Sequence, residues 1–467
     1  MICRHSAEAM NVHREEAFRR FKQNGFPTKK VERYKYTDIA ALMAPNFGLN
    51  LNRLTIPADP YQAFHCDVPN LSTSLYFVVN DTFFGSKGDK GGNGDKGGNG
   101  DIVDKVDNGV VVTSLRAALA SNLPSPFTLH PSPSNLPSPL LSSLYNRLAG
   151  KDGDAITDLN TMLAQDGLLV YIPRGVVVDR AIQVINILKA PPSWGKSGAE
   201  SLMVNRRVLI VAEEGAEVTL LFCDHTADDH RFLTTQVIEV FAADRSRVNL
   251  YCLEETHARN VRLSNVYVDQ QADSVVNHNV ITLHNGITRN KLDLHLSDEG
   301  ASCECLGCAI TDKQQHVDNN TLIVHHAQHC TSDELYKYVL DEQATGAFAG
   351  RVLVEHGAQK TTSQMTNQNL CASREARMYT QPMLEIYADD VKCAHGSTVG
   401  QLNDAALFYM RQRGIGEREA RLLLQVAFIN QVIERIALVP LRDRLHYLVD
   451  KRFRGELSKC EGCKLCR

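Results

Sequence analysis

The amino-acid sequence predicts a mainly β protein with a β-helix core and an α-helical region on each side of it. From about residue 165, strand-like runs with alternating apolar residues follow one another, as in "GLLVYIP" and "RRVLIVAEEGAEVTLLFC". A unit of alternating apolar residues, acidic or small residues and a second strand recurs from Val208, Val237, Asn265 and Leu292, at intervals of 29, 28 and 27 residues. Stacked coils of a β-helix require such a drifting repeat, because each strand pairs with its counterpart in the next coil.

A β-sandwich, with strands at intervals of about 8–12 residues, is the alternative fold. The repeat favours the β-helix, because a sandwich has no reason to repeat at an interval near 28 residues. Looser copies of the unit begin at Tyr336 and Leu384.

The predicted N-terminal helical region, residues 1–164, begins with a helical pattern over 7–42 that Gly25 and Pro27 divide into two helices. Residues 85–101 repeat GDKGGN without one apolar side chain. Nothing in this segment offsets the entropy of ordering, so it predicts a disordered Gly/Lys/Asp insertion. A Pro/Ser loop with two copies of "NLPSP" follows, and its prolines favour an extended surface chain.

The β-helix core is predicted over 165–398, and the pattern becomes helical again over 399–457. "NDAALFYMRQRG" offers Asn403 as an N-cap and ends at Gly414. "GEREARLLLQVAFINQVIERIAL" carries one apolar stripe, and "RGIG" joins these two helices into a hairpin. "PLRDRLHYLVDKRFRGEL" adds a third helix, and a cysteine-rich tail over 458–467 closes the chain.

The composition is that of an ordinary globular protein. The 467 residues are 43% hydrophobic and 22% charged, with a formal net charge of −4, which argues against a nucleic-acid binder. The N-terminus has no apolar run of a signal peptide, and no apolar stretch approaches the roughly 20 residues that span a bilayer. Thirteen cysteines, an odd number, indicate a reducing cytosol. We therefore expect free buried thiols at Cys66, Cys223, Cys252, Cys330 and Cys371.

The usual sequence templates of catalysis are missing. The sequence contains no GxxxxGK[ST] phosphate loop, no GxGxxG after a strand, no GxSxG elbow and no HExxH. We therefore expect that the chain does not hydrolyse ATP itself. A β-helix carbohydrate-active enzyme is an alternative function, but it needs clustered carboxylates and usually aromatic platforms. One Trp and 7% aromatic residues speak weakly against it.

Two internal groups of histidines and cysteines are candidate metal sites. In "VHHAQHC", the adjacent His325 and His326 point to opposite faces of a strand, so we expect surface or coil-edge histidines there. In "CECLGC", Cys303 and Cys305 share a strand face, and Cys308 follows a glycine. These thiols bind a soft metal or form a stack of small buried residues, and the stack is the favoured interpretation.

The C-terminal "CEGCKLC" repeats the CxxC spacing with Cys460, Cys463 and Cys466. Neighbouring Lys and Arg residues favour thiolates, and three thiolates with one outside ligand suit zinc or an iron–sulfur cluster. A stand-alone iron or zinc carrier that uses this tail is therefore a second alternative function. An unstructured tail without a ligand stays open beside it.

The segment "ADDVKCAHGSTVG", residues 388–400, places Cys393 and His395 on one face of a strand. An active site, a metal site and a surface that meets another protein are all compatible with such a pair. The residues alone do not choose among these three.

Residues 358–415 carry a resemblance to a known family. "AQKTTSQMTNQNL" and the following "QNLCASREARMYTQPMLEIYADDVKCAHGSTVGQLNDAALFYMRQRGI" closely resemble the SufD branch of the SufB/SufD family, the scaffolds of iron–sulfur cluster assembly. "PTKKVERYKYT" is similar to the family's "PTRK.E.WKYT", with Tyr34 where tryptophan is common. The resemblance covers the whole layout and is most specific in the last hundred residues before the tail. The insertion, "CECLGC" and the cysteine tail depart from the family pattern.

The resemblance implies a right-handed parallel β-helix core and a non-catalytic scaffold subunit in the cytoplasm. It implies pairing with a SufB-like paralogue, a possible homodimer when alone, and docking of the SufC ATPase, which hydrolyses ATP. The family's functional histidine lies in a "KCSHG" segment, which maps onto His395, and Cys393 matches its cysteine. An iron–sulfur cluster is then expected to form transiently at the SufB–SufD interface.

The helices after this segment are the expected dock for SufC. Phe408 and Tyr409 offer apolar anchors and Arg413 lies at the rim, and these residue types are favoured at interface hot spots. The alternative is that Leu407 and Phe408 simply pack the helical hairpin.

Overall fold

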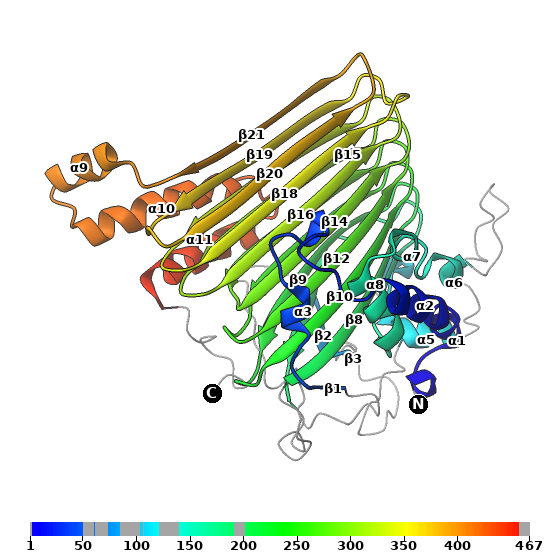
Figure 1. The fold of residues 1–467 in the computed structure, drawn as a ribbon. Coiled ribbons are helices and arrows are strands. Elements are labelled where there is room, and N and C mark those ends of the chain that lie inside the picture. Colours follow the sequence, from blue (N-terminus) through cyan, green and yellow to red (C-terminus); the bar gives the residue numbers. More distant parts are fainter. Residues whose placement is uncertain are drawn as a thin grey trace.

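A computed structural model describes residues 2–49, 60, 73–84, 103–105, 107–120, 140–190 and 201–456. Figure 1 shows a parallel β-solenoid in which two large sheets face each other, with helices on both flanks. The predicted insertion over 85–101, the Pro/Ser loop and the cysteine tail lie outside the described residues.

Successive strands of the core alternate between the two sheets. Within the described residues, sheet A has 11 strands: β1 (Phe47–Leu49), β4 (Val103–Lys105), β5 (Val111–Ser114), β6 (Leu168–Ile172), β8 (Ser201–Ala212), β10 (Phe232–Ala242), β12 (Val261–Gln270), β14 (Ile287–Leu296), β16 (His316–His325), β18 (Thr345–Val354) and β20 (Arg377–Ile386). Sheet B has 10 strands in the same described part: β2 (Thr73–Val79), β3 (Thr82–Phe84), β7 (Ala181–Leu188), β9 (Glu217–Thr226), β11 (Arg247–Glu255), β13 (Val275–His284), β15 (Ser302–Thr311), β17 (Thr331–Leu340), β19 (Thr362–Cys371) and β21 (Lys392–Gly400).

The helices lie before and after the core strands, on the flanks. They are η1 (Ile2–Arg4), α1 (Glu8–Asn11), α2 (Arg14–Asn24), η2 (Glu32–Tyr34), α3 (Ile39–Leu42), η3 (Asp107–Gly109), α5 (Leu115–Ala120), α6 (Leu140–Leu144), α7 (Ala149–Asp152), α8 (Ala155–Leu163), α9 (Asp404–Gln412), α10 (Glu417–Ile433) and α11 (Val439–Arg454). None of these described helices combines the length and apolar character needed to cross a lipid bilayer.

The sequence repeat corresponds to the coils of the solenoid. Val208, Ile238, Val266 and Leu292 lie in register on four successive strands of sheet A, so consecutive coils take up roughly the interval seen in the sequence. All these pairings are parallel, which confirms the predicted β-helix and rules out the sandwich. The inward side chains of both sheets form one continuous apolar core.

The acidic or small residues of the repeat lie in a stack of tight turns. One residue per coil has a positive φ at this corner: Gly175, Gly215, Arg245, Asp273, Gly300, His329 and Lys360. Each of these turn residues donates its backbone N–H to a carbonyl in the turn of the next coil, for example Gly215 to Asp244 at 2.8 Å. Gly, Asn and Asp tolerate this left-handed conformation best, which accounts for Gly175, Gly215, Asp273 and Gly300. Arg245, His329 and Lys360 adopt it without this advantage.

The C-terminal helices follow the sequence prediction, and two of them, α10 and α11, cover sheet B. Asn403 caps α9 by accepting hydrogen bonds from the backbone N–H groups of Ala405 and Ala406, and Gly414 follows the helix with a φ of 83°. Helices α10 and α11 bury their apolar stripes against the outer face of sheet B. Arg435, which pairs with Glu304 and Asp333, adds a polar clamp between these helices and the sheet.

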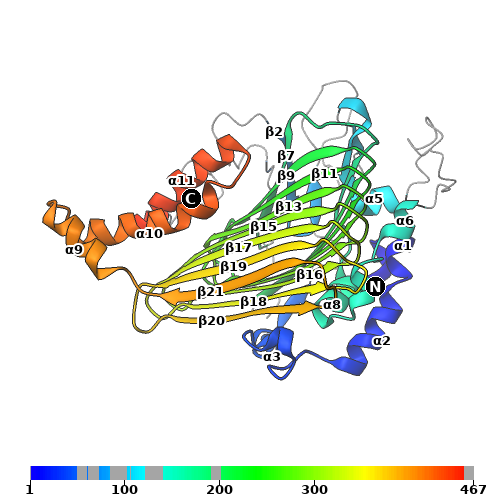
Figure 2. The same ribbon diagram turned by 90° about the horizontal axis from the view of Figure 1, so that it is seen from above.

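The predicted second N-terminal helix is wrong. Helix α2 ends at Asn24 before Gly25 as expected, but the segment after Pro27 forms only the short turns η2 and α3. Its side chains bind the outer face of sheet A instead, and these contacts outweigh the helical propensity of the segment. Figure 2 shows the N-terminal helices and the C-terminal helices on opposite sides of the solenoid.

A buried acid in the core gives the fold a pH dependence. Glu334 of β17 faces inward, and burial raises the pKa of its carboxyl group to about 7, although the Thr321 side chain lowers it in part. A raised carboxyl pKa means that the folded state keeps a proton which the unfolded state loses, so stability falls as the pH rises from about 4.5 to 7.

We expect Glu334→Gln to stabilise the protein at pH 8 by about 1–3 kcal/mol, because the amide never takes up the buried charge. At pH 4.5 the variant and the parent protein should differ little. Urea unfolding at the two pH values measures both quantities. Glu15→Gln on the exposed face of α2 is the matched control, and an equal effect of the two variants at pH 8 contradicts the explanation.

Candidate functional site

The solenoid is open at the end where its last two strands lie. Strands β20 and β21 are the terminal strands of sheets A and B, so each is paired on one side only. No residue of either strand is buried, whereas all 12 residues of β8 are buried. A pair of uncovered edges of this length is a template for another chain, because its backbone N–H and C=O groups are unpaired.

The opposite end of the solenoid is closed by the chain itself. Strand β3 folds back antiparallel on β2, and β5 runs antiparallel to β6. Helix α5 and its neighbours pack near this end on the outer face of sheet A, in a separate apolar cluster with β5, β6, β8 and β10. The two ends therefore differ: one is capped, and the other lacks a cover among the described residues.

Cys393 and His395 lie on the inward face of β21, at this open end. Their register partners on β19 are Ser363 and Met365, and Cys393 packs against the solenoid core. Because no coil follows β21, His395 is exposed although it points inward, and its imidazole has no hydrogen-bond partner in the described part of the chain. Burial raises the pKa of the half-buried Cys393 thiol, so this residue is a neutral thiol near pH 7.

Side-chain hydrogen bonds hold β21 in place beside His395. The Ser397 hydroxyl lies 2.6 Å from the Thr380 hydroxyl of β20, which links the last strands of the two sheets. On β19, Asn369 donates to the backbone carbonyl of Thr398 at 2.9 Å. These contacts fix the strand on which the candidate residues lie, so His395 is presented on an ordered edge.

The other predicted metal candidates lie apart from the open end. Cys303 and Cys305 face the solenoid core, and Cys308 lies on the outer face of sheet B under the C-terminal helices. This placement agrees with the stack of small buried residues. His325 and His326 point to opposite faces of the strand, as predicted, and His326 contacts Glu355 at the surface. His325 is not a surface histidine: it is buried, and its ring lies 2.9 Å from the Ser332 hydroxyl.

No group of three or more His, Cys, Asp or Glu side chains among the described residues is arranged to hold a metal ion. The described cysteines are free thiols, and Cys223, Cys252 and Cys330 are buried as expected, whereas Cys371 is only half-buried. Cys66 and the tail cysteines Cys460, Cys463 and Cys466 lie outside the described residues.

Helix α9 follows three residues after β21 and projects away from the solenoid (Figure 1). Phe408 and Tyr409 on this helix are 64% and 60% exposed, and Arg413 stacks over the Tyr409 ring with its guanidinium carbon 5.2 Å from the centroid. Leu407 is buried, so it packs the hairpin as the alternative states, but Phe408 does not.

The sequence analysis missed the polar contacts that join the N-terminal segment to sheet A. Lys291, Asp293 and Asp152 belong to a buried charge network that also includes Arg33. The signal in the sequence was Lys291 and Asp293 within the strand "NKLDLHL", since charged side chains in a strand with few exposed positions need partners.

Comparison with known proteins gives a consistent result over nearly the whole chain. Residues 195–428 match the SUF system FeS cluster assembly SufBD core domain, and residues 1–184 match the SufBD protein N-terminal region. An iron–sulfur cluster assembly SufBD family protein of Synechocystis is 30% identical over 71% of this chain and 74% of its own length. The iron–sulfur cluster assembly protein SufD of Escherichia coli is 27% identical over 64% and 69%. Protein ABCI7, chloroplastic, of Arabidopsis thaliana is 26% identical over 67% and 66%. The chain therefore belongs to the SufBD family of iron–sulfur cluster assembly proteins.

Proposed function

We propose that the chain is a SufD-type scaffold subunit whose open end is completed by a SufB-like paralogue. The observation that carries this proposal is the uncovered pair of edge strands, β20 and β21, with an unpartnered imidazole between them. When two solenoids meet at such ends, the unpaired backbone groups of each edge strand find partners in the other chain. The partly apolar open end is buried at the same time.

The nascent iron–sulfur cluster is cargo of this interface. An imidazole is a borderline ligand for iron and a thiolate is a good one. His395 supplies one ligand from this chain while the partner supplies thiolates, so the site exists only in the complex. Cys393 lies on the same strand face as His395 and is a second candidate ligand. Its thiol must first lose a proton to bind iron, because burial raises the pKa of that thiol.

The SufC ATPase docks on α9 through Phe408, Tyr409 and Arg413. The support is the exposure of two neighbouring aromatic side chains on a helix that projects away from the solenoid (Figure 1) and buries only Leu407. Truncation of such anchors typically costs more than 1 kcal/mol of binding free energy. Nucleotide-driven movement of SufC then reaches β21 directly, because only three residues join the end of that strand to α9.

A crossed co-purification experiment tests both contacts. Val399→Lys places a charge at the open end, where Val399 is exposed. This variant should lower the recovery of the SufB-like subunit at least ~10-fold and leave the recovery of SufC unchanged. Phe408→Ala with Tyr409→Ala should do the reverse, with loss of SufC and retention of the SufB-like subunit. The measurement is the amount of each partner that co-purifies with the tagged chain.

Phe18→Ala is the matched control, because Phe18 is 55% exposed on α2 and far from both surfaces in the sequence. Normal recovery of both partners with Val399→Lys and with the double α9 variant contradicts the proposal.

The family match disfavours the carbohydrate-active enzyme as an alternative function. The cytosol stays the proposed compartment, although the Arabidopsis relative is named chloroplastic.

A further inference from the structure

Residues 32–37, here called the strap, cross the outer face of sheet A between the buried charge network and the open end. The strap lies outside the surfaces used in the proposed function. Its side chains contact strands β14, β16 and β20, which are far from it in the sequence. Some residues of the strap bind the interior strands of sheet A, and others bind its edge strand.

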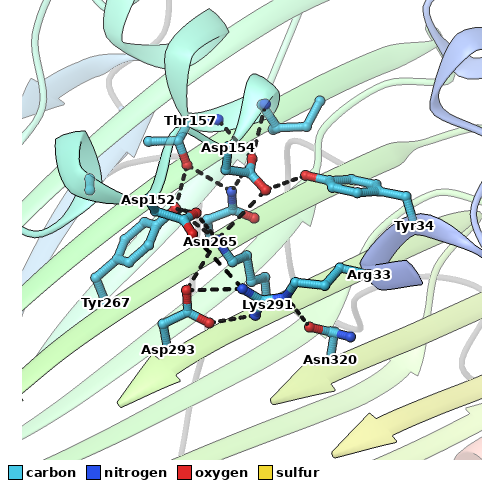
Figure 3. A network of polar contacts seen from close by, with 12 residues as sticks. Arg33, Tyr34, Asp152, Asp154, Thr157, Asn265, Tyr267, Lys291, Asp293 and Asn320 are labelled. Carbon is cyan, nitrogen blue, oxygen red and sulfur yellow. Dashed lines mark hydrogen bonds and ion pairs between the residues drawn. The ribbon is translucent and has the colours of Figure 1, made fainter. Parts of the chain in front are cut away.

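Arg33 and Tyr34 anchor the strap in the charge network of Figure 3. Arg33 donates to the Asn320 side chain at 2.8 Å and pairs with Asp293, and the Tyr34 hydroxyl donates to Asp154. Lys291, only 1% exposed, lies 3.2 Å from Asp293 and 3.6 Å from Asp154. If the strap left this site, Asp293 would lose its ion pair with Arg33 inside the network. Removal of one partner of a buried ion pair is strongly unfavourable.

Three further contacts fix the direction of the strap. The Arg289 guanidinium lies 4.0 Å from the centroid of the Tyr34 ring and donates to the backbone carbonyl of Arg33 at 2.7 Å. The Thr37 hydroxyl donates to Asp318 of β16 at 2.6 Å. Between these fixed points, Tyr36 is directed toward the end of sheet A.

Glu32 and Tyr36 of the strap hold the edge strand β20. The Tyr36 ring stacks on the Tyr379 ring with centroids 5.0 Å apart and an angle of 17° between the planes. The Tyr36 hydroxyl donates to the Gln381 side-chain carbonyl at 3.2 Å, and the Gln381 amide donates to Glu32 at 3.0 Å. Three strap-to-strand contacts therefore meet on two neighbouring outward positions of β20.

We propose that the strap is a positioning element that fixes β20 in the conformation required for docking of the second solenoid chain. The inference rests on the proposed function, because it assigns a role at the same open end. An edge strand is paired on one side only, so it opens locally at a lower free energy than the strands inside the sheet. Contacts that order it in advance reduce the entropy lost on binding and so strengthen binding.

The test compares Tyr36→Ala with Tyr36→Phe and Gln381→Ala in the full chain. Hydrogen exchange of the unbound chain should become faster across β20 in Tyr36→Ala and Gln381→Ala and stay unchanged across β12 and β14. The dissociation constant for the co-produced SufB-like subunit should rise about 3- to 10-fold in Tyr36→Ala. Tyr36→Phe, which keeps the ring stack, should lie much closer to the parent protein.

Tyr447→Ala is the control for the loss of a half-exposed tyrosine, because Tyr447 lies on α11 and is 44% exposed. It should change neither quantity. Unchanged exchange across β20, or unchanged affinity despite faster exchange, overturns the inference. Weaker binding with unchanged exchange also overturns it, because Tyr36 then contacts the partner directly. Val399→Lys distinguishes a failure of this inference from a failure of the proposed function. Normal binding of the SufB-like subunit by that variant contradicts the proposed function itself.

Discussion

His395→Ala is expected to reduce the iron and sulfide content of the co-purified complex at least ~10-fold while the complex itself still forms. The imidazole is exposed at the open end and has no hydrogen-bond partner among the described residues, so its removal costs little folding free energy. Loss of one ligand at an interface site instead removes cluster binding. The measurement is anaerobic iron and sulfide analysis of the purified complex, with subunit recovery measured in parallel.

The experiment needs a background without the tail cysteines. Deletion of residues 458–467 removes Cys460, Cys463 and Cys466, so any iron that remains is bound elsewhere. His329→Ala is the matched histidine control, because His329 is exposed at a turn of the solenoid. Unchanged cluster content in His395→Ala removes the role proposed for this residue. Complete loss of iron on tail deletion alone supports the carrier alternative instead.

The second large effect is expected on stability. Lys291→Ala should lower the free energy of unfolding at pH 7 by about 3–5 kcal/mol, because Asp152, Asp154 and Asp293 lose the cation they share. Although burial raises it, the pKa of Asp154 is held below its usual value by Lys291 and Arg289. Burial likewise raises the pKa of Asp293, but Lys291 and Arg33 lower it overall.

These lowered pKa values fix the sign of the pH dependence. A carboxyl group whose folded pKa lies below its unfolded value stabilises the protein above about pH 4, and this stabilisation is lost as the pH falls. The parent protein should therefore lose stability steeply below pH 4, and Lys291→Ala should show a shallower loss. Urea unfolding between pH 3 and 7 measures this, with Lys30→Ala as the control at an exposed lysine. Equal slopes for the two variants contradict the assignment.

Local pattern was sufficient for the coils and for the C-terminal helices. The alternation of side chains fixes which residues of a strand share a face, and the interval between units fixes how the coils stack. Asn403 and Gly414 likewise mark the ends of α9, because capping depends on a few neighbouring backbone groups.

The segment after Pro27 shows where local pattern fails. Its composition favours a helix, but Arg33, Tyr34 and Thr37 bind side chains more than 100 residues away. Such contacts are decided by the assembled sheet, and their combined free energy exceeds the small differences in helix propensity. A charged strand such as "NKLDLHL" signals that partners exist without indicating which segment supplies them.

The alternation of strand side chains is enough to place Cys393 and His395 on one face, without knowledge of the rest of the fold. Whether that inward face is sealed or open to solvent depends on the assembled stack: it is buried in an earlier coil such as β17 and exposed in β21. The difference arises from position in the stack. A coil is covered when another follows it, and β21 is the last strand of its sheet.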